Sequence, residues 1–421
     1  MNNPLPPDTV FFILSSSTWD GLSSTSLAIA KELSKEFSVY YFDYPYTYKD
    51  LFLRKQDKKT RKRKGAWKDS KRQYHQPFKN FPSLKIVYSP PVWPVNWLSE
   101  GTLYQKMMRR NNSVFEQQVQ RTCEEENIEN YIFLNFFAPF YGYRLQHGKR
   151  PPLLSIYQSY DNMEASPYFS KHGVRQEDFC FECYDISLTT SELVRDIIEN
   201  RTGRHLEVIG NAVDFDLFRK AAEQKPADFP ANGKKTIGYT GNIGFRIDFE
   251  LLYKLAKAYP DCNVVCIGPK KIPKHNSHDF RALDNVYFLG SKPIEELPAY
   301  LSFFDCAIIP FVRNDFTAGM YSLKINEYLS QAKPVVTTNY APSIDQFKQV
   351  LYLADSHNDF LKQVAIALNE NPSEDEKKLR IKTAKSNSWK DRTTQYLKII
   401  RKALNKNEKT NTAQASEHSN T

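Results

Sequence analysis

The sequence predicts an α/β protein made of two Rossmann-like domains, each a mostly parallel sheet with helices packed on it. Three observations carry this prediction. Short runs of β-branched and aromatic residues alternate with longer helical patterns, which is typical of βαβ units. The alternation weakens after Phe218 into a polar stretch with Pro and Gly, and then begins again. The chain has 421 residues, more than the roughly 250 to 300 that a single hydrophobic core usually holds.

Each half contains its own series of strands and helices. The strands of the first half are expected at 10–14, 39–42, 84–88, 131–134, 153–157, 186–189 and 206–209, and its helices at 22–37, 102–127, 167–184 and 192–200. The strands of the second half are expected at 236–240, 263–267, 286–289, 306–310, 334–337 and 350–353, and its helices at 248–258, 293–303, 321–332, 358–369 and 374–387. The domains are therefore expected at 1–210 and 211–388. A helix at 389–404 is expected to pack back on the first domain, followed by a disordered tail at 405–421.

Composition predicts a cytoplasmic protein with reduced thiols. No stretch approaches the roughly 20 apolar residues that a membrane-spanning helix needs, and the first apolar run, 10–14, is too short for a secretory signal. The six Cys residues are scattered, as expected for thiols packed among apolar groups. Cys180 and Cys183 form one CxxC pair, but a zinc site needs two further ligands at matching spacing. No metal site is expected.

The nucleotide-binding signatures with the strongest sequence patterns are absent. No GxGxxG follows the first predicted strand and no GxxxxGK[ST] occurs, which argues against an NAD enzyme and a P-loop NTPase. The first strand is followed by the small polar loop 15–21, with the sequence SSSTWDG. This loop either cradles an anion or a sugar, or simply caps the next helix.

The second half offers candidate ligand contacts after two predicted strands. Its first strand runs into GYTGNIGFR, where glycines let a ligand approach the backbone and Arg246 adds a positive charge. Lys324 and Glu327 lie three residues apart near the start of a predicted helix, so they share one face. There Lys324 is suited to neutralise a phosphate and Glu327 to accept hydrogen bonds from a ribose diol. The alternative is an exposed ion pair that contributes only about 0.2 to 0.5 kcal/mol.

Several longer runs match the motifs of a known family. They are YSLKINEYLSQAKPVVTTN, VIGNAVDFDLF, LTTSELV and VYFLGSKPIEELPAYLSFFDCAIIPF. They resemble, in that order, the (P/S)xKxxEYxxxGKPVV, IPNGVDxxxF, TSExL and VxFLGxxPxxELPxYLxxxDVxxxPF segments of GT-B glycosyltransferases of the broad group-1, or GT4-like, type. The resemblance covers most of positions 10 to 400. The opening STWDGLSSTSLAIAKELSKEFSVYYFDYP and the run SYDNM are most similar to bacterial polysaccharide enzymes related to teichuronic-acid transferases.

The resemblance implies a fold, a reaction and a set of site residues. The fold would be GT-B, two facing Rossmann-like domains with a deep cleft between them. The reaction would move a sugar from a nucleotide-diphosphate donor on the C-terminal domain to an acceptor on the N-terminal domain. It would need no metal ion or other cofactor, because basic side chains and a helix N-terminus stabilise the leaving diphosphate. The implied donor contacts are Arg246 and Lys324 at the diphosphate, Glu327 at the ribose, the turn of Gly290 and Ser291 under the base, and further contacts from Gly241, Asn242 and Tyr321.

One departure from the family concerns the catalytic mechanism. Retaining members carry an acidic residue eight positions before the ribose-binding one, and this sequence has Gly319 there, with Asp315 four residues earlier as the nearest substitute. An inverting enzyme needs a general base that takes the proton from the acceptor hydroxyl. Asp161, at the end of a predicted strand, is the first candidate, with the N-cap of the next helix as its alternative role. Asp20 is the second candidate.

The net charge of +10 comes almost entirely from one insertion in the first domain. Residues 54–72 (Arg54 to Arg72) hold eleven Lys or Arg and two Asp, which gives a local charge of +9. So charged a stretch is expected to be a mobile loop or an interaction arm outside the core. Its target is either nucleic acid or anionic lipid. The aromatic residues Trp93 and Trp97 nearby favour a membrane surface, so no nucleic acid partner is expected.

Together these features favour a peripheral glycosyltransferase at the inner face of the cytoplasmic membrane. Its substrates would be a nucleotide sugar and a lipid-linked or cell-surface glycan. One alternative is a nucleotide-sugar epimerase of the same fold, although no set of His and carboxylate residues suited to its acid–base chemistry is evident. The other alternative is a non-catalytic membrane- or nucleic-acid-binding protein that uses only the basic insertion.

Overall fold

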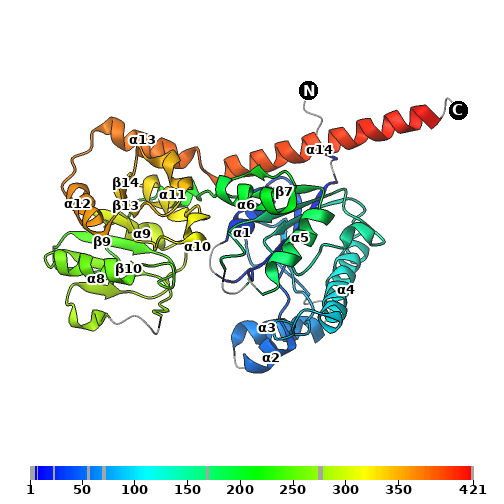
Figure 1. Ribbon diagram of the computed structural model, residues 1–421, viewed down its shortest axis with the longest axis horizontal. Coiled ribbons are helices and arrows are strands. Elements are labelled where there is room, and N and C mark those ends of the chain that lie inside the picture. The colour runs from blue at the N-terminus through cyan, green and yellow to red at the C-terminus, as the bar shows by residue number, and fades with distance from the viewer. Residues whose placement is uncertain are drawn as a thin grey trace. The chain divides into compact units, whose positions relative to one another are not determined.

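The computed structural model describes residues 5–6, 8–21, 24–54, 57–68, 73–166, 169, 171–273 and 278–418, with the backbone alone over 407–418. The chain divides into two compact units, Met1–Ile209 with Arg392–Thr421, and Gly210–Asp391. Each unit is a largely parallel sheet with helices packed on it (Figure 1). The prediction of an α/β protein with two Rossmann-like domains is therefore confirmed. The cleft expected between the domains stays a prediction.

The first unit is built on an eight-stranded sheet of order β3-β4-β2-β1-β5-β6-β7-β8. Its strands are β1 Val10–Ser15, β2 Ser38–Phe42, β3 Tyr74–His75, β4 Leu84–Val87, β5 Tyr131–Phe136, β6 Leu154–Ser159, β7 Ile186–Thr189 and β8 Glu207–Val208. The strands pair in parallel except for β3 with β4. β1, β5 and β6 are buried along their whole length. Such strands are covered on both faces, which explains their near-continuous apolar sequences.

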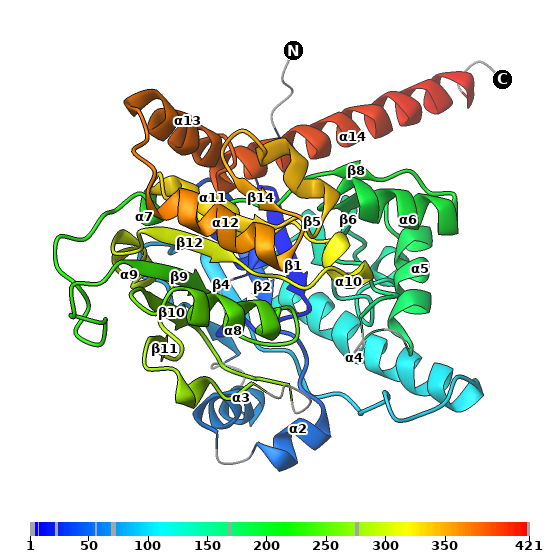
Figure 2. The same ribbon diagram turned by 60° about the vertical axis from the view of Figure 1, so that its left-hand side comes forward.

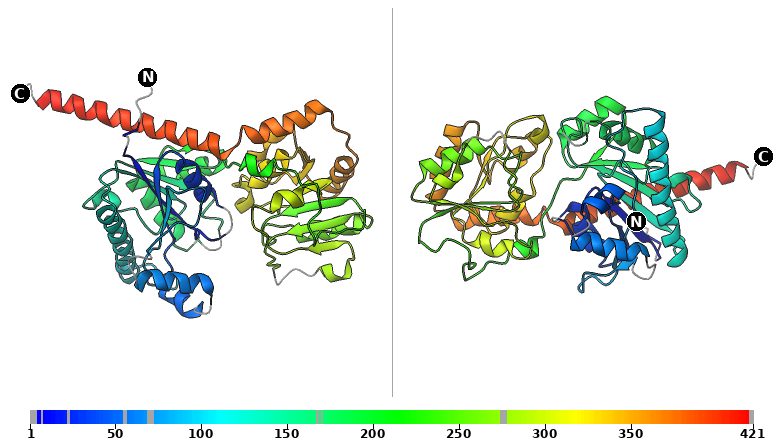
Figure 3. Two further views of the ribbon diagram at one scale, coloured as in Figure 1. Left: turned by 180° about the vertical axis from the view of Figure 1, so that it is seen from behind. Right: turned by 90° about the horizontal axis from the view of Figure 1, so that it is seen from below.

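Most helices of the first unit cover the two faces of this sheet. They are α1 Thr25–Leu33, α2 Tyr48–Leu53, α3 Lys58–Lys68, α4 Thr102–Glu125, α5 Gly173–Cys183, α6 Glu192–Thr202 and α14 Trp389–His418. On one face α4 packs with α5 and α6, and the ring of Phe115 lies 5.6 Å from that of Phe42. On the other face α1 packs against the sheet, and the hydroxyls of Ser26 and Tyr41 lie 2.9 Å apart. Figure 3 shows α1 and α4 on opposite sides of the sheet.

The C-terminal helix α14 packs on the first unit. The Tyr396 hydroxyl donates to the side-chain oxygen of Gln158 on β6, and the Tyr396 ring lies 6.0 Å from that of Phe136. The sequence predicts a helix only to 404 and a disordered tail beyond it, whereas α14 continues to His418. Residues 405–418 contain neither Pro nor Gly, so no residue in them stops the helix. The last three residues, 419–421, lie outside the described part of the chain.

The second unit contains a six-stranded parallel sheet of order β11-β10-β9-β12-β13-β14. Its strands are β9 Thr236–Thr240, β10 Asn263–Ile267, β11 Val286–Phe288, β12 Cys306–Ile309, β13 Val335–Thr338 and β14 Tyr352–Ala354. Its helices are α7 Phe215–Phe218, α8 Phe249–Ala258, α9 Leu297–Ser302, α10 Asp315–Ala318, α11 Leu323–Ser330, α12 His357–Leu368 and α13 Glu374–Lys385. Figure 2 shows α8 and α12 on one face of the sheet. The strand order reverses between β9 and β12, and open α/β sheets bind ligands outside the carboxyl ends of their strands at such a switch point.

Candidate functional site

Three glycines line the carboxyl edge of the second sheet. Gly241, Gly268 and Gly290 come after β9, β10 and β11, and their φ angles are 127°, 145° and 71°. The Gly241 N–H donates to the Ile267 carbonyl at 2.7 Å, and the Gly268 N–H donates to the Gly290 carbonyl at 2.8 Å. A Cβ on Gly268 would lie 1.9 Å from the Gly241 carbonyl oxygen. The strand ends therefore pack backbone against backbone, which leaves an edge that a ligand can approach closely.

Gly268 was missed as a site residue from the sequence, although it stands directly after a strand as Gly241 does. Gly268→Ala is expected to lower the free energy of unfolding by at least about 1 to 3 kcal/mol, because a φ of 145° is strained for alanine and the new Cβ meets the Gly241 carbonyl. Gly233→Ala is the control, since its φ of 76° is also positive but no atom lies within 4 Å of its Cβ position. Urea denaturation measures both variants. Equal losses would contradict the close packing of this edge.

Lys324 and Glu327 come from α11 and lie at this edge. The Lys324 side chain lies directly over Gly241. A Cβ added to Gly241 would lie 2.6 Å from the Lys324 Nζ. The same Nζ lies 5.6 Å and 5.8 Å from the ring centroids of Tyr239 and Phe311. Within the described part of the chain, neither Lys324 nor Glu327 makes a hydrogen bond or an ion pair within 4.0 Å. The exposed ion pair considered from the sequence is therefore not formed.

Both of these charged side chains are half-buried. Burial lowers the pKa of Lys324; the Glu327 carboxylate opposes this effect and the positive charge of Arg246 adds to it. Burial raises the pKa of Glu327, and the nearby Lys324 opposes that shift. A partly dehydrated cation and carboxylate that make no hydrogen bond to a described residue are well placed to bind a polar ligand.

The loop after β9 supplies a second cation. The Arg246 guanidinium lies 5.5 Å from the ring of Phe245 and 5.2 Å from that of Phe316, and these contacts restrict its direction. Asn242 is exposed in the same loop, and its carbonyl accepts from the Tyr239 hydroxyl at 3.1 Å. The positive charge of Arg246 adds to the effect of burial in lowering the pKa of Lys324. Two cations beside the first turn of α11 form an electropositive site suited to a diphosphate.

Tyr321 is placed differently from the other predicted donor contacts. Its ring is buried 5.5 Å from that of Phe347, and its hydroxyl accepts from the Asn326 amide at 2.7 Å. Its carbonyl accepts from the Asn211 amide at 2.7 Å. The side chain therefore belongs to the core and holds the start of α11 in place. The turn of Gly290 and Ser291, by contrast, is exposed and open to a base.

Asp315 and Gly319 lie at opposite ends of α10. Asp315 is exposed in the first turn, and Gly319 is the buried residue directly after the last turn. The position eight residues before Glu327 therefore has no carboxylate, and Asp315 does not occupy the place of Gly319. That the Asp315 carboxylate substitutes in function for the acidic residue missing at position 319 stays a prediction.

Asp161 lies at the carboxyl edge of the first sheet, two residues after β6. The next helix, α5, begins at Gly173 with His172 as its N-cap, so Asp161 does not cap a helix. The carbonyl of the preceding Tyr160 accepts from the Thr190 hydroxyl at 2.7 Å, which fixes the strand end. Asp161 itself is half-exposed. Its place at the edge suits the predicted base, and that role stays a prediction.

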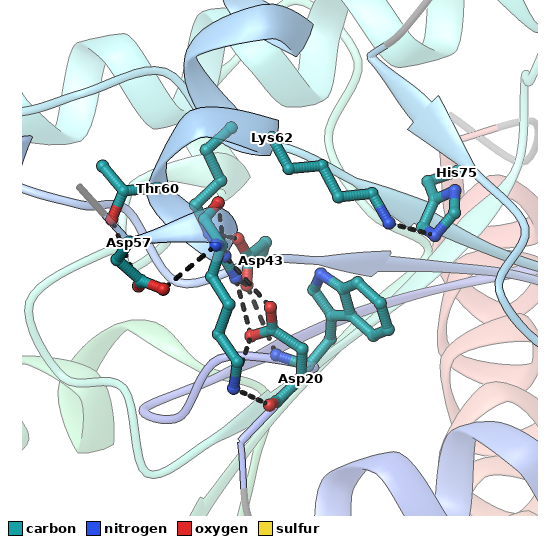
Figure 4. Close-up of polar contacts among 9 residues, drawn as sticks. Asp20, Asp43, Asp57, Thr60, Lys62 and His75 are labelled. Carbon is teal, nitrogen blue, oxygen red and sulfur yellow. Dashed lines mark hydrogen bonds and ion pairs between the residues drawn. The ribbon is translucent and has the colours of Figure 1, made fainter. Parts of the chain in front are cut away.

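Asp20, the second candidate base, lies in a cluster of charged side chains (Figure 4). Arg63 of α3 donates to the Asp20 carboxylate at 3.0 and 3.2 Å and to that of Asp43, directly after β2, at 2.6 and 3.1 Å. Burial alone would raise the pKa of Asp20, but Arg63 and Lys59 outweigh it, so the pKa is lowered. A carboxylate with a lowered pKa is a weak proton acceptor. Asp20 is better explained by its structural role than as a base.

Residues 57–68 of the basic insertion form a structured helical segment, not the mobile loop or arm that their charge predicts. Thr60, Arg63 and Ala66 of α3 are buried, and the Trp67 indole N–H donates to the Ser89 carbonyl at 2.8 Å. Arg63 enters the core because two carboxylates from distant segments neutralise it. Composition does not reveal that pairing, so Arg63 and Asp43 were missed. Residues 55–56 and 69–72 of the insertion lie outside the described residues.

The chain is similar to known proteins in sequence and in fold. Residues 234–370 match the family model of the glycosyl transferases group 1. Over 190 residues the chain is 27% identical to TuaH of Bacillus subtilis (strain 168), a protein named as a teichuronic acid biosynthesis glycosyltransferase. That match covers 44% of this chain and 48% of TuaH, so it spans about half the length of the curated relative.

The fold is also that of several solved structures. A sucrose-phosphate synthase from Thermosynechococcus elongatus aligns with a TM-score of 0.62 at 13% identity, over 93% of this chain and 98% of that one. An α,α-trehalose-phosphate synthase (UDP-forming) from Burkholderia vietnamiensis aligns with a TM-score of 0.62 at 12% identity, over 93% and 97% of the two chains. These likenesses show the GT-B fold predicted from the sequence motifs.

Proposed function

We propose that the protein transfers a sugar from a nucleoside diphosphate sugar to a glycan or lipid-linked acceptor, which the match of residues 234–370 to the family model of the glycosyl transferases group 1 supports. The observation that carries the proposal is the position of Lys324. Its ammonium lies across Gly241 at the glycine edge, half-buried and without a hydrogen bond to any described residue. A diphosphate bound there would supply the missing partner. Glu327, one turn along α11, would accept from the ribose hydroxyls.

The proposed reaction needs charge neutralisation on the donor and a base on the acceptor. The acceptor oxygen bonds to the anomeric carbon of the donor sugar while the bond from that carbon to the diphosphate breaks. Lys324, Arg246 and the start of α11 stabilise the negative charge of the leaving diphosphate, so no metal ion is required. For a reaction that inverts the anomeric carbon, the Asp161 carboxylate is the proposed base that takes the proton from the acceptor hydroxyl.

The proposed location is the inner face of the cytoplasmic membrane, where a lipid-linked or cell-surface glycan precursor is extended. Among the residues that the structure describes, no helix has the length and apolar character to cross a bilayer. The basic insertion 54–72 is proposed to hold the protein at an anionic membrane surface. No nucleic acid partner is part of this proposal.

The proposed function is tested by melting the protein with UDP-, GDP-, TDP- and CMP-sugars. We expect one nucleotide class to raise the Tm by roughly 5 to 10 °C, since a ligand at 100 times its Kd stabilises by about 2.7 kcal/mol and each kcal/mol shifts a domain of this size by roughly 2 to 4 °C. Lys324→Met should abolish the shift, whereas the exposed Lys362→Met should keep it. The stabilising donor should then be consumed only when an acceptor is added, at a rate unchanged by EDTA.

Two results would reject the proposal. The first is the absence of any shift together with the absence of donor consumption for all four nucleotide classes. The second is conversion of the donor sugar to another sugar without an acceptor, which would identify a nucleotide-sugar epimerase.

A further inference from the structure

We propose that one surface of the first unit docks on an anionic lipid bilayer by inserting the tip of α2. The surface, named the docking surface here, consists of α2, the exposed side of α3 and the segment 93–97. It deepens the proposed function by defining how a lipid-linked acceptor is reached, and it rests on that function only for the identity of the acceptor.

The apolar part of the docking surface is unusually concentrated. Among the described residues, five of the eleven exposed large hydrophobic side chains lie in 48–53 and 93–97. Phe52 and Leu53 are 74% and 66% exposed at the end of α2, a helix with no buried residue. Trp97 is 71% exposed. Single exposed apolar side chains are ordinary on a soluble surface, but a cluster of this kind marks an interaction site.

The two apolar segments form one continuous surface. The rings of Tyr48 and Trp93 lie 4.9 Å apart, and the Tyr48 N–H donates to the Val92 carbonyl at 2.9 Å. Thr47 and Val92 also form a parallel bridge. The aromatic residues of 93–97 are therefore held beside α2.

The cationic part of the surface is the outer side of α3. Figures 1 and 2 show α3 next to α2. Arg63 points inward to Asp20 and Asp43, so the opposite side of the helix is directed to solvent. That side carries the exposed Lys58, Arg61 and Lys68. Lys59 and Lys62 are exposed too, but they contact the Asp20 carbonyl and the His75 ring. The buried cluster thus fixes which face of a strongly basic helix is presented.

This combination fits a membrane interface better than other partners. Cations attract the anionic headgroups, indole rings prefer the headgroup level, and an apolar tip enters the boundary of the acyl chains. A nucleic acid would use the cations of α3 but would leave the exposed apolar side chains of Phe52 and Leu53 in water. Anionic lipid is therefore the partner proposed for the docking surface.

A cavity opens on the docking surface. It has a volume of about 420 Å³, and its lining includes Lys49 and Arg54 from the α2 side together with Trp93 and Trp97. Tyr44 and Tyr141 also line it, with their rings 5.3 Å apart. A headgroup that carries phosphate and sugar, still attached to a lipid in the bilayer, can enter this cavity from the membrane side. The cations are suited to its phosphate and the aromatic rings to its sugar.

The test is co-sedimentation of the full chain with vesicles of phosphatidylcholine alone or of phosphatidylcholine and phosphatidylglycerol at a ratio of 7:3. We expect binding to the mixed vesicles, and at least tenfold weaker binding to the neutral ones. The double variant Phe52→Ser, Leu53→Ser should bind mixed vesicles at least tenfold more weakly. Lys58→Glu, Arg61→Glu should lose the preference for anionic lipid.

The matched control is Ile366→Ser, Leu379→Ser, which removes two exposed apolar side chains from the second unit. It should bind vesicles as the unchanged protein does. Equal vesicle binding by the α2 variant and this control would overturn the proposal, as would an absence of binding to mixed vesicles. A change from dimer to monomer in light scattering on Phe52→Ser, Leu53→Ser would also overturn it, because the surface would then join two copies. The Tm shift with nucleotide sugar tests the proposed function separately and should be unchanged in every variant here.

Discussion

Replacing Lys324 by methionine is expected to lower the rate of sugar transfer at saturating donor by about 100- to 1,000-fold. The substitution removes a preorganised positive charge from the leaving diphosphate, and the loss of one such group costs roughly 2.7 to 4 kcal/mol in the transition state. A methionine side chain is nearly as long as the aliphatic part of lysine, so it still packs over Gly241. The folded protein should be as stable as before or slightly more stable, because a half-buried ammonium without a hydrogen bond to any described residue is removed.

The control for Lys324→Met is Lys362→Met, which removes an exposed charge from α12 of the same unit. Initial rates over a range of donor concentrations give kcat and the KM for the donor separately. Lys324→Met should lower kcat and also raise the KM for the donor, so that kcat/KM falls further than kcat, because the ammonium contacts the diphosphate in the bound donor and stabilises its growing charge in the transition state. Glu327→Gln should mainly raise the KM for the donor, since a ribose contact is made equally in the ground and transition states. A Lys324→Met enzyme with a kcat within twofold of the unchanged protein would contradict the role proposed for this ammonium.

Local periodicity predicts the fold well. The alternation of short strands and longer helices predicts both sheets, because parallel strands covered on two faces have near-continuous apolar sequences. β1, β5 and β6 are such strands. The pair Lys324 and Glu327 is predicted on one face of α11 from its spacing alone. These features depend on neighbours only a few residues away along the chain.

Features that depend on distant partners are not predicted. Arg63 is buried only because Asp20 and Asp43 lie 43 and 20 residues away in sequence but within hydrogen-bonding distance. The ring of Tyr321 is buried against that of Phe347, and its main-chain carbonyl accepts from Asn211, 110 residues before it. From composition, Arg63 is expected to be a solvated charge. From the family motif, Tyr321 is expected to contact the donor. In both cases the tertiary partner decides the role of the side chain.

Replacing Arg63 by methionine is expected to lower the free energy of unfolding by about 3 to 5 kcal/mol at neutral pH. The substitution leaves two carboxylates without their guanidinium partner, and a buried charge that loses its partner costs about that much. The side chain of Asp43 is only 2% exposed and that of Asp20 14% exposed, so water cannot replace the lost contacts fully. Lys59, which is half-exposed and 4.0 Å from Asp20, compensates little.

The loss of unfolding free energy in Arg63→Met should be larger at neutral pH than at acidic pH. Burial raises the pKa of Asp43 to about 6 even with Arg63 present. Removal of the guanidinium raises the pKa of Asp43 further and takes away the main cause that lowers the pKa of Asp20. The folded variant then binds more protons than the unfolded chain, in which aspartates titrate near pH 4. Its stability is therefore fully retained below about pH 4, falls as the pH rises from there through the folded pKa of Asp43, which lies above about 6, and levels off at higher pH.

Urea denaturation between pH 4 and pH 8 measures this loss against two matched variants. Arg61→Met removes an exposed arginine from the same helix and should change stability by no more than about 0.5 kcal/mol at any pH. Arg63→Met combined with Asp20→Asn and Asp43→Asn replaces the whole charged cluster by neutral groups, so it should recover most of the stability and lose the pH dependence. If Arg63→Met were as stable as Arg61→Met at neutral pH, or equally weakened at pH 4 and pH 8, the cluster would not hold α3 to the first unit by charge pairing.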